Sequence, residues 1–290
     1  DVFAPAILQL YQLTLINGSA PATGLYGGGA ILNRSSGTLD LNQISLRENS
    51  SQSVGGAIDN SGSARLTYVT LDANLASSEE SLYVAGGAIY NGGSLIVYNS
   101  LFFNNTASNP DGIDYGGGLF NDNTATLLNV TFSQNSAEWG GGIFHNGDEA
   151  NLYNVTFTDN STAIHTAFSL RIKNSIVSNS TAGVNCNGDG IITSLGHNID
   201  SGTSCNFDIE GINPLLGSLA DNQGPIYTHA LLAGSPAIDS GDNTDCPATD
   251  QRGAIRPADG NGDSIRVCDI GAYEAQAYFP LIIYLPILRK

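Results

Sequence analysis

Apolar and polar residues follow a pattern that recurs between residues 27 and 181. Each copy opens with a glycine-rich corner that leads into a short apolar strand, as in residues 86–91. The apolar anchors of this first element are Ile31, Ile58, Ile89, Leu119 and Ile143, with a copy lacking glycines at Ile164. A repeat of this length predicts stacked units that each bury an apolar face on the next.

A second element follows each corner, as in residues 127–132, and its period-two alternation predicts one longer β-strand. Its expected inward residues stack as Leu46, Leu71, Phe102, Phe132 and Phe157, and three residues after each comes Asn49, Asn74, Asn105, Asn135 or Asn160. Asparagine tolerates left-handed backbone and can bond its copy one coil away. We therefore interpret this column as a corner ladder, with a ligand-binding row of amides as the alternative.

Together the two elements predict an all-β, helix-poor chain that forms a parallel β-helix of about ten coils. We expect an N-terminal apolar segment and first coil over residues 1–26 and the repeats over 27–182. A loop-rich portion over 183–274 and an extended apolar strand over 275–290 complete the chain. The glycine runs lack the following helix and Lys-Ser/Thr of a phosphate loop.

Charge is sparse and acidic, with 27 acidic residues against 10 basic ones and a net charge of −17. This balance argues against nucleic acid or an anionic membrane as a partner, and it suits cation binding. No apolar run reaches the ~20 residues of a membrane-spanning helix. The sequence contains no methionine, so we expect it to begin after a removed export segment, outside the cell or on its surface.

The four cysteines fall in two close pairs, Cys186 with Cys205 and Cys246 with Cys268. An even count in a loop-rich region predicts two disulfides and an oxidising compartment. A metal site is the alternative, although the CxxC and HxxxH spacings of zinc sites are missing.

Two insertions interrupt successive copies at the same place, over residues 75–85 and 106–115, so we expect them to lie side by side. They form either a solvated pair of loops or a ridge that binds sugar or a cation. The candidate ligand-binding residues are Glu79, Tyr83, Asp111, Asp114 and Tyr115.

An acidic turn near the end of the chain has the D-x-N-x-D spacing that places oxygen ligands around Ca²⁺. Its candidate ligands are Asp259, Asn261 and Asp263, with Asp269 approaching from the side. Ile270 stands where a calcium loop would carry its bidentate glutamate. A solvated acidic turn is the alternative to the calcium site.

Both ends of the chain are apolar, and an open β-helix end is an unpaired strand edge. We expect these ends to contact each other in neighbouring copies, head to tail. The candidate residues are Val2, Phe3, Ile7 and Leu8 at one end and Phe279, Leu281, Ile283, Leu285 and Ile287 at the other.

Over roughly residues 13–181 the repeat resembles polymorphic outer-membrane protein repeats and related right-handed parallel β-helix surface proteins. Residues 183–274 resemble the choice-of-anchor Q module of bacterial surface proteins, on the strings at 235–239, 250–253 and 268–274. The resemblance implies a right-handed coil and an exported, cell-surface or extracellular protein with a C-terminal sorting tail. It implies no reaction.

Three functions fit these features. The first is a non-enzymatic structural protein that associates end to end into a fibre, and the second is a monomeric adhesin or stalk that binds glycan. The third is a polysaccharide lyase or hydrolase, which needs acids and a base converging on one face. The bases of the repeat region are scattered over different columns, which disfavours catalysis: Arg34, Arg47, Arg65, Arg171 and Lys173.

Overall fold

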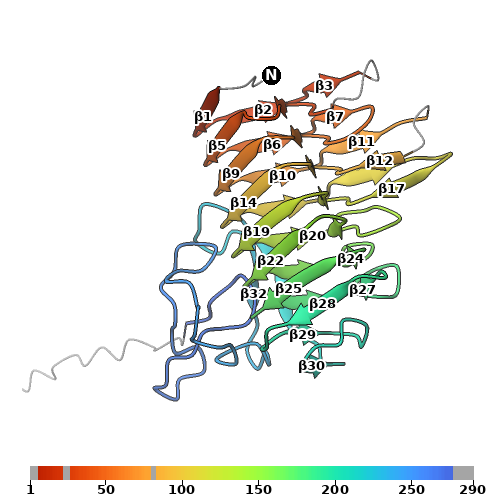
Figure 1. Cartoon of the computed structure of the whole chain (residues 1–290). Helices are drawn as coiled ribbons and strands as arrows, with labels where there is room; N and C mark the ends of the chain where they lie inside the picture. Colours follow the sequence, from red (N-terminus) through yellow and green to blue (C-terminus); the bar gives the residue numbers. More distant parts are fainter. Residues whose placement is uncertain (1–5, 22–26, 80–82, 277–290) are drawn as a thin grey trace, which may run out of the picture.

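The computed structural model describes residues 6–21, 27–79 and 83–276 (Figure 1). Within these residues there is no helix, and the chain winds as a parallel β-helix, as the repeat predicts. Three parallel sheets run along the stack of coils (Figure 1). The longest has nine strands, and the expected count of about ten coils stays a prediction.

The long-strand sheet takes one strand, usually of five residues, from each of eight coils. Alternate residues point into the interior, which the burial pattern of these strands follows. Its strands are β1 (Ile7–Tyr11), β5 (Thr38–Asn42), β9 (Ser63–Thr67), β14 (Ser94–Tyr98), β19 (Thr124–Leu128), β22 (Glu149–Tyr153), β25 (Ser169–Lys173) and β28 (Ile191–Ser194).

The phenylalanine sheet follows directly along the chain and carries the stacked apolar column. Its strands are β2 (Thr14–Ile16), β6 (Ser45–Arg47), β10 (Thr70–Asp72), β15 (Leu101–Phe103), β20 (Thr131–Ser133), β23 (Thr156–Thr158), β26 (Ile176–Ser178), β29 (Ile199–Asp200) and β30 (Ile209–Glu210). The parallel sheets therefore continue past residue 182 into the portion expected to be loop-rich.

The glycine-corner sheet is made by the short strands that follow the glycines. Gly55 shows why glycine is needed, since its φ is 62° and a Cβ there would lie 2.2 Å from the carbonyl oxygen of Ile58. The strands are β4 (Ile31–Asn33), β8 (Ile58–Asn60), β13 (Ile89–Asn91), β18 (Leu119–Asn121), β21 (Ile143–His145), β24 (Ile164–Thr166) and β27 (Cys186–Asn187).

Smaller sheets complete the coils. A four-stranded parallel sheet contains β3 (Ser19–Ala20), β7 (Ser50–Ser51), β11 (Leu75–Ser77) and β16 (Thr106–Ser108), and a parallel pair contains β12 (Tyr83–Ala85) and β17 (Ile113–Tyr115). The one antiparallel pair of named strands in the described chain joins β31 (Leu216–Ala220) and β32 (Thr228–Leu231).

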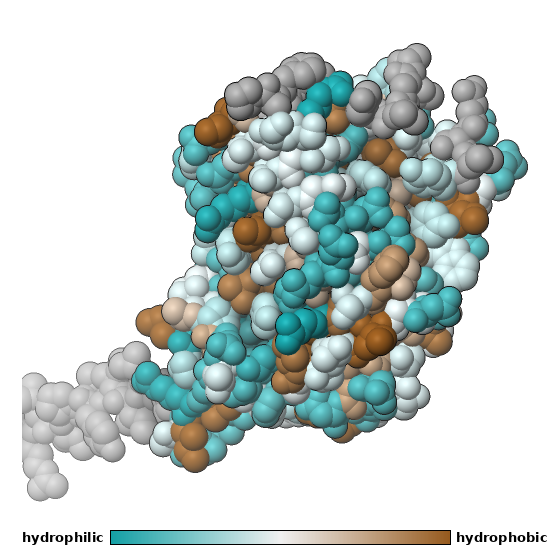
Figure 2. Space-filling view, viewed as in Figure 1, coloured by the Kyte–Doolittle hydropathy of each residue, from teal (hydrophilic) through white to brown (hydrophobic). Residues whose placement is uncertain are grey.

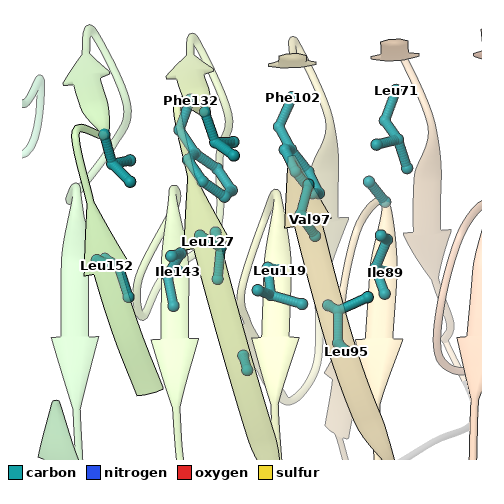
Figure 3. Packing of buried hydrophobic residues seen from close by; sticks show 14 of the residues in the cluster. Leu71, Ile89, Leu95, Val97, Phe102, Leu119, Leu127, Phe132, Ile143 and Leu152 are labelled. Atoms are coloured by element: carbon teal, nitrogen blue, oxygen red, sulfur yellow. The ribbon is translucent and has the colours of Figure 1, made fainter. Parts of the chain in front are cut away.

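The predicted stack of apolar side chains is confirmed (Figure 3). Phe102 and Phe132 have ring centroids 4.3 Å apart, and Phe132 and Phe157 have centroids 4.9 Å apart. Leu46 and Leu71 continue this column in register, and all five side chains are fully buried. Rows from the other two sheets, such as Val97 to Leu152 and Ile89 to Ile143, fill the rest of the interior (Figure 3).

The expectation of one longer strand per second element is wrong, because each such stretch is two strands in different sheets. A residue in the left-handed region bends the chain between them, with φ between 49° and 54° at Gln43, Tyr68, Asn99, Asn129, Asn154 and Asn174. The bend turns the chain around the core, so residues from both strands, such as Leu127 and Phe132, are still buried in it.

The asparagine ladder is confirmed. Each Nδ2 donates to the Oδ1 of the copy one coil later at 2.8 to 3.0 Å, through Asn49, Asn74, Asn105, Asn135 and Asn160. The expectation that these asparagines are themselves left-handed is wrong. The residue before each takes that conformation, with φ of 53° to 58° at Glu48, Ala73, Asn104, Gln134 and Asp159, which leaves the asparagine amide free to point along the stack.

The flank arm, defined as residues 211–276, lies along one side of the stack of coils (Figure 1). Both predicted disulfides are present, Cys186–Cys205 in the last coils and Cys246–Cys268 in the arm. On the face shown in Figure 2, apolar residues are scattered among polar ones.

Candidate binding surfaces

The two insertions are neighbours, as expected, and form a projecting fin made of β11, β12, β16 and β17. Tyr83 pairs with Ile113, and Val84 pairs with Asp114. Isolated bridges link Val54 to Ala85 and Tyr115 to Trp139, so the fin is joined to the coils on both sides.

Two of the five candidate ligand residues in the fin hold the structure together. Asp114 accepts hydrogen bonds from the backbone N–H of Asn109 at 3.2 Å and of Glu138 at 2.5 Å. Tyr115 packs edge-on against Phe144 with ring centroids 4.7 Å apart. Glu79, Asp111 and Tyr83 are exposed and remain candidates for contact with a ligand.

An aromatic column that the sequence analysis missed lies beside the fin, on the outer face of the glycine-corner sheet. Tyr90, Phe120, Phe144 and His165 stack one per coil, with centroids 5.3, 5.3 and 4.8 Å apart. Burial lowers the pKa of His165, so the ring stays neutral near pH 7. This column could have been found in the sequence, because an aromatic residue or histidine directly follows each of four apolar anchors: Ile89, Leu119, Ile143 and Ile164.

A second polar ladder was also missed. Asn33, Asn60, Asn91 and Asn121 donate Nδ2 to the next Oδ1 at 2.6 to 2.7 Å, and the last amide meets Nδ1 of His145 at 2.9 Å. Burial lowers the pKa of His145, which keeps a neutral ring able to accept at Nδ1 while Nε2 meets the carbonyl of Ser169. These buried side chains stabilise the coils.

The flank arm docks on the left-handed asparagines at the bends. Asn129 donates to the carbonyl of Thr249 at 2.8 Å, Asn154 to that of Asp269 at 3.2 Å and Asn174 to that of Asp242 at 3.0 Å. Because all three asparagines are buried, they bind the arm and are not available to another molecule.

Buried charges hold the arm together. Arg256 Nε lies 3.0 Å from Glu274 Oε2, with both side chains fully buried, and Arg252 lies 2.7 Å from Asp250. The first contact is an ion pair without the alignment of a good hydrogen bond. Burial, together with the nearby Glu274 carboxylate, raises the pKa of Asp269 to about 7.

The acidic turn binds its own backbone. Asp259 accepts from the N–H groups of Gly262 and Ser264 at 2.6 and 2.9 Å, and Asn261 and Asp263 each accept from the residue two positions on. Asp269 is buried elsewhere, accepting from the N–H groups of Asp239 and Ala275. Within the described residues no three His, Cys, Asp or Glu side chains are grouped to hold a metal ion. The calcium site stays a prediction.

The two ends of the β-helix differ. At the first coil, β1, β2 and β3 are the outermost strands of three sheets in the described chain, and Ile7, Tyr11 and Ile16 are 73%, 55% and 50% exposed. Leu8 points inward and packs on the core.

At the last coil, Cys205 and Phe207 belong to the core cluster and close its end. The other residues expected at the ends lie outside the described residues: Val2, Phe3, Phe279, Leu281, Ile283, Leu285 and Ile287.

A groove runs along the outer face of the phenylalanine sheet where the flank arm stops. It contains two cavities of ≈350 and ≈340 Å³, which share Ser45, Thr70, Pro225 and Ile226 in their linings. The first also touches Gln12, Gln43 and Tyr68, and the second touches Arg47, Asp72, Phe103 and Tyr227.

Residues 129–146 match the Chlamydia polymorphic membrane protein repeat. The matched stretch runs from a bend through Phe132 of the stack and the ladder residue Asn135 to the corner at Gly140 and into β21. The fold and this match together show a β-solenoid repeat protein, part of which is similar to that membrane protein repeat. Comparisons with curated proteins and with solved structures give no match.

The match does not reach the strings at 235–239, 250–253 and 268–274, so their likeness to choice-of-anchor Q stays a resemblance. In the described part of the chain no helix has the length and apolar character needed to cross a membrane.

Proposed function

We propose that this is a non-enzymatic extracellular or cell-surface structural protein that associates end to end. In this association the first coil of one copy binds the apolar segment at residues 279–288 of the next. The observation that carries the proposal is a difference between the two ends of the described β-helix. Both ends finish in edge strands, but Cys205 and Phe207 close the core at the last coil, whereas the inward residues of the first coil are only partly buried: Leu8, Leu10, Leu13 and Leu15.

The first coil has the properties of a strand acceptor. The outer edges of β1, β2 and β3 carry backbone N–H and C=O groups that no strand in the described chain binds. Such a row of groups is a template for a further strand. The exposed Ile7 and Tyr11 would gain burial under it.

The segment at 279–288 has the composition of a strand donor. Five apolar residues, 281–285, lie between Pro280 and Pro286, and β1 has the same length of five residues. Proline cannot donate to a ladder, so the two prolines limit the strand to the residues between them. A contact between unlike surfaces does not close on itself, so repeated contacts give a fibre.

An extracellular setting is supported by the cysteines. Both pairs form disulfides, and the described chain holds no free cysteine. Disulfides persist in oxidising compartments such as the cell exterior.

The test is the mass of the full chain in solution by light scattering, with electron microscopy of the same sample. We expect fibres or oligomers, which should be lost in Ile7→Lys/Tyr11→Lys because charged edges resist strand addition. Deletion of residues 277–290 should have the same effect. The control is Ile191→Lys, which is 69% exposed in the same sheet at the closed end and should still assemble.

A monomeric full chain, or fibres that survive both changes, would refute the proposal. Loss of assembly in Ile191→Lys would mean that the last coil, not the segment at 279–288, binds the first. New reducing ends released from a polysaccharide would contradict the non-enzymatic part.

A further inference from the structure

The groove on the phenylalanine sheet has a floor of hydroxyl groups. Thr14, Ser45 and Thr70 occupy the same register position on successive coils and face outward. Further along, the same column is covered, because Thr131 Oγ1 donates to Gln251 of the flank arm at 2.6 Å. The outer face of the phenylalanine sheet is therefore uncovered at the floor of the groove in the first coils, whereas the flank arm covers it in later coils.

We propose that this groove binds a neutral oligosaccharide. On one side, Gln12 Nε2 donates to Gln43 Oε1 at 2.7 Å, which presents amide groups along the groove. On the other side, Arg47 Nε lies 3.1 Å from Asp72 Oδ2. Hydroxyl, amide and paired charged groups at regular spacing match the many hydroxyls of a sugar chain.

Tyr227 supplies an aromatic surface at the edge of the groove. Its side chain is 54% exposed, although the neighbouring Ile226 is buried. Aromatic rings offer rigid apolar area with a polar end, which suits ligands that carry both apolar faces and hydroxyls.

Contacts within the flank arm fix the position of the arm tip that carries Tyr227. Arg252 Nη1 donates to the carbonyl of Asn222 at 3.2 Å, and its guanidinium lies 3.6 Å from the ring centroid of Tyr273. The side chain of Asn222 also donates to the carbonyl of Thr228 at 2.8 Å. A wall held in place before binding lowers the entropy cost of binding.

Other classes of ligand fit less well. Within the sheet β6 and β10 are paired on both sides, and the one free edge, on β2, lies at the end of the groove, so a peptide cannot add as a strand to the face of the floor. A polyanion would meet one arginine already paired with Asp72 on a chain of net charge −17. An apolar ligand would leave the threonine, serine and glutamine groups of the floor without partners.

The length of the groove sets the size of the ligand. It crosses four coils, from Thr14 on β2 to Leu101 on β15, which is about 14 Å at roughly 4.8 Å per strand. A chain of several sugar rings fits this span, and a single ring would fill one cavity only.

The test is binding of neutral hexasaccharides of glucose, mannose and galactose, with hexagalacturonate as the acidic comparator. The variant Ile7→Lys/Tyr11→Lys, which we expect to be monomeric, is measured beside the full chain so that the effect of self-association on binding can be recognised. We expect binding of at least one neutral hexasaccharide, weakened about tenfold or more by Tyr227→Ala or Gln43→Ala. Unchanged thermal unfolding of both variants shows that they fold.

The matched control is Tyr83→Ala, which removes a similarly exposed tyrosine, 49% against 54%, from the fin. It should leave the affinity unchanged. Loss of binding in Tyr83→Ala with retention in Tyr227→Ala would move the site to the fin and overturn the proposal. Binding of none of the neutral chains, or tighter binding of hexagalacturonate, would also overturn it.

Discussion

The β-helix and the flank arm are held together in different ways. In the β-helix a side chain meets its own copy one coil away, as Phe132 meets Phe102 and Phe157. In the arm each side chain meets an unlike partner, as Arg256 meets Glu274. The first arrangement spreads the stabilising contacts over many coils, and the second concentrates them in a few buried charges.

This difference predicts which substitutions destabilise the whole β-helix and which destabilise only the arm. A repeat protein gains stability from each unit and from each contact between neighbouring units. A buried ion pair depends on both partners, because removing one leaves the other charged and without compensation. A substitution in the apolar core should therefore destabilise the whole stack of coils. A substitution in the buried ion pairs should detach the arm and leave the coils folded.

The largest effect is expected from Phe132→Ala. This change opens a cavity in the centre of the stack and should lower the free energy of unfolding by about 3–5 kcal/mol. Urea unfolding followed by circular dichroism measures it. Phe168→Ala, at a position 55% exposed, is the control and should change it by less than about 0.5 kcal/mol. Equal effects would show that the stacked column is not the main source of stability.

A somewhat smaller effect, confined to the arm, is expected from Arg256→Met. The change leaves Glu274 buried without its cation and should weaken docking of the arm by about 3 kcal/mol. Limited proteolysis should then cut within 211–276 while the circular dichroism of the β-helix is kept.

Arg266→Met serves as the control, since this arginine is exposed. Combining Arg256→Met with Glu274→Leu should restore part of the protection. If the coils unfold together with the arm, the two regions are one cooperative unit and the comparison fails.

The smallest effect is a dependence on pH. The pKa of Asp269 is about 7 in the folded protein and 3.8 without burial, so the folded arm holds a proton that the unfolded arm releases. Stability of the arm should therefore fall as pH rises from about 4 to about 7. Glu274 has a pKa shifted in the same direction.

Hydrogen exchange of the arm at pH 5 and pH 8 measures this dependence. Asp269→Asn should flatten it, although loss of an acceptor for Asp239 or Ala275 lowers stability at both pH values. Better protection of the arm at pH 8 would contradict the assignment.

The parts that could be predicted from the sequence are those where each residue repeats its neighbour's environment. The stack through Phe102, the ladder through Asn105 and the pairing of the two insertions all follow from spacing alone. The bend at Asn99 was missed because alternation of apolar residues continues through it, and a left-handed residue leaves no mark in that pattern.

The flank arm could not be predicted, because its contacts with the coils join residues far apart in the sequence, many of them more than a hundred positions apart. Thr131 meets Gln251, and Asn154 meets Asp269, with no periodicity to indicate either pair. The groove was missed for the same reason, since its wall at Pro225 and its floor at Ser45 come from distant parts of the chain. The cysteine pairs were predictable because each is local in sequence.

The arm touches successive bends of the β-helix in turn, at Ser100, Asn129, Asn154 and Asn174. The spacing of these contact points on the arm is therefore matched to the spacing of the coils. A whole coil inserted or deleted beneath these four contacts would displace every later one. The same change before Ser100 would lengthen or shorten the rod, keep the four hydrogen bonds and alter only the coils that face the arm tip at Pro225 and Ile226. Variation in the size of such a protein should thus be confined to its first coils.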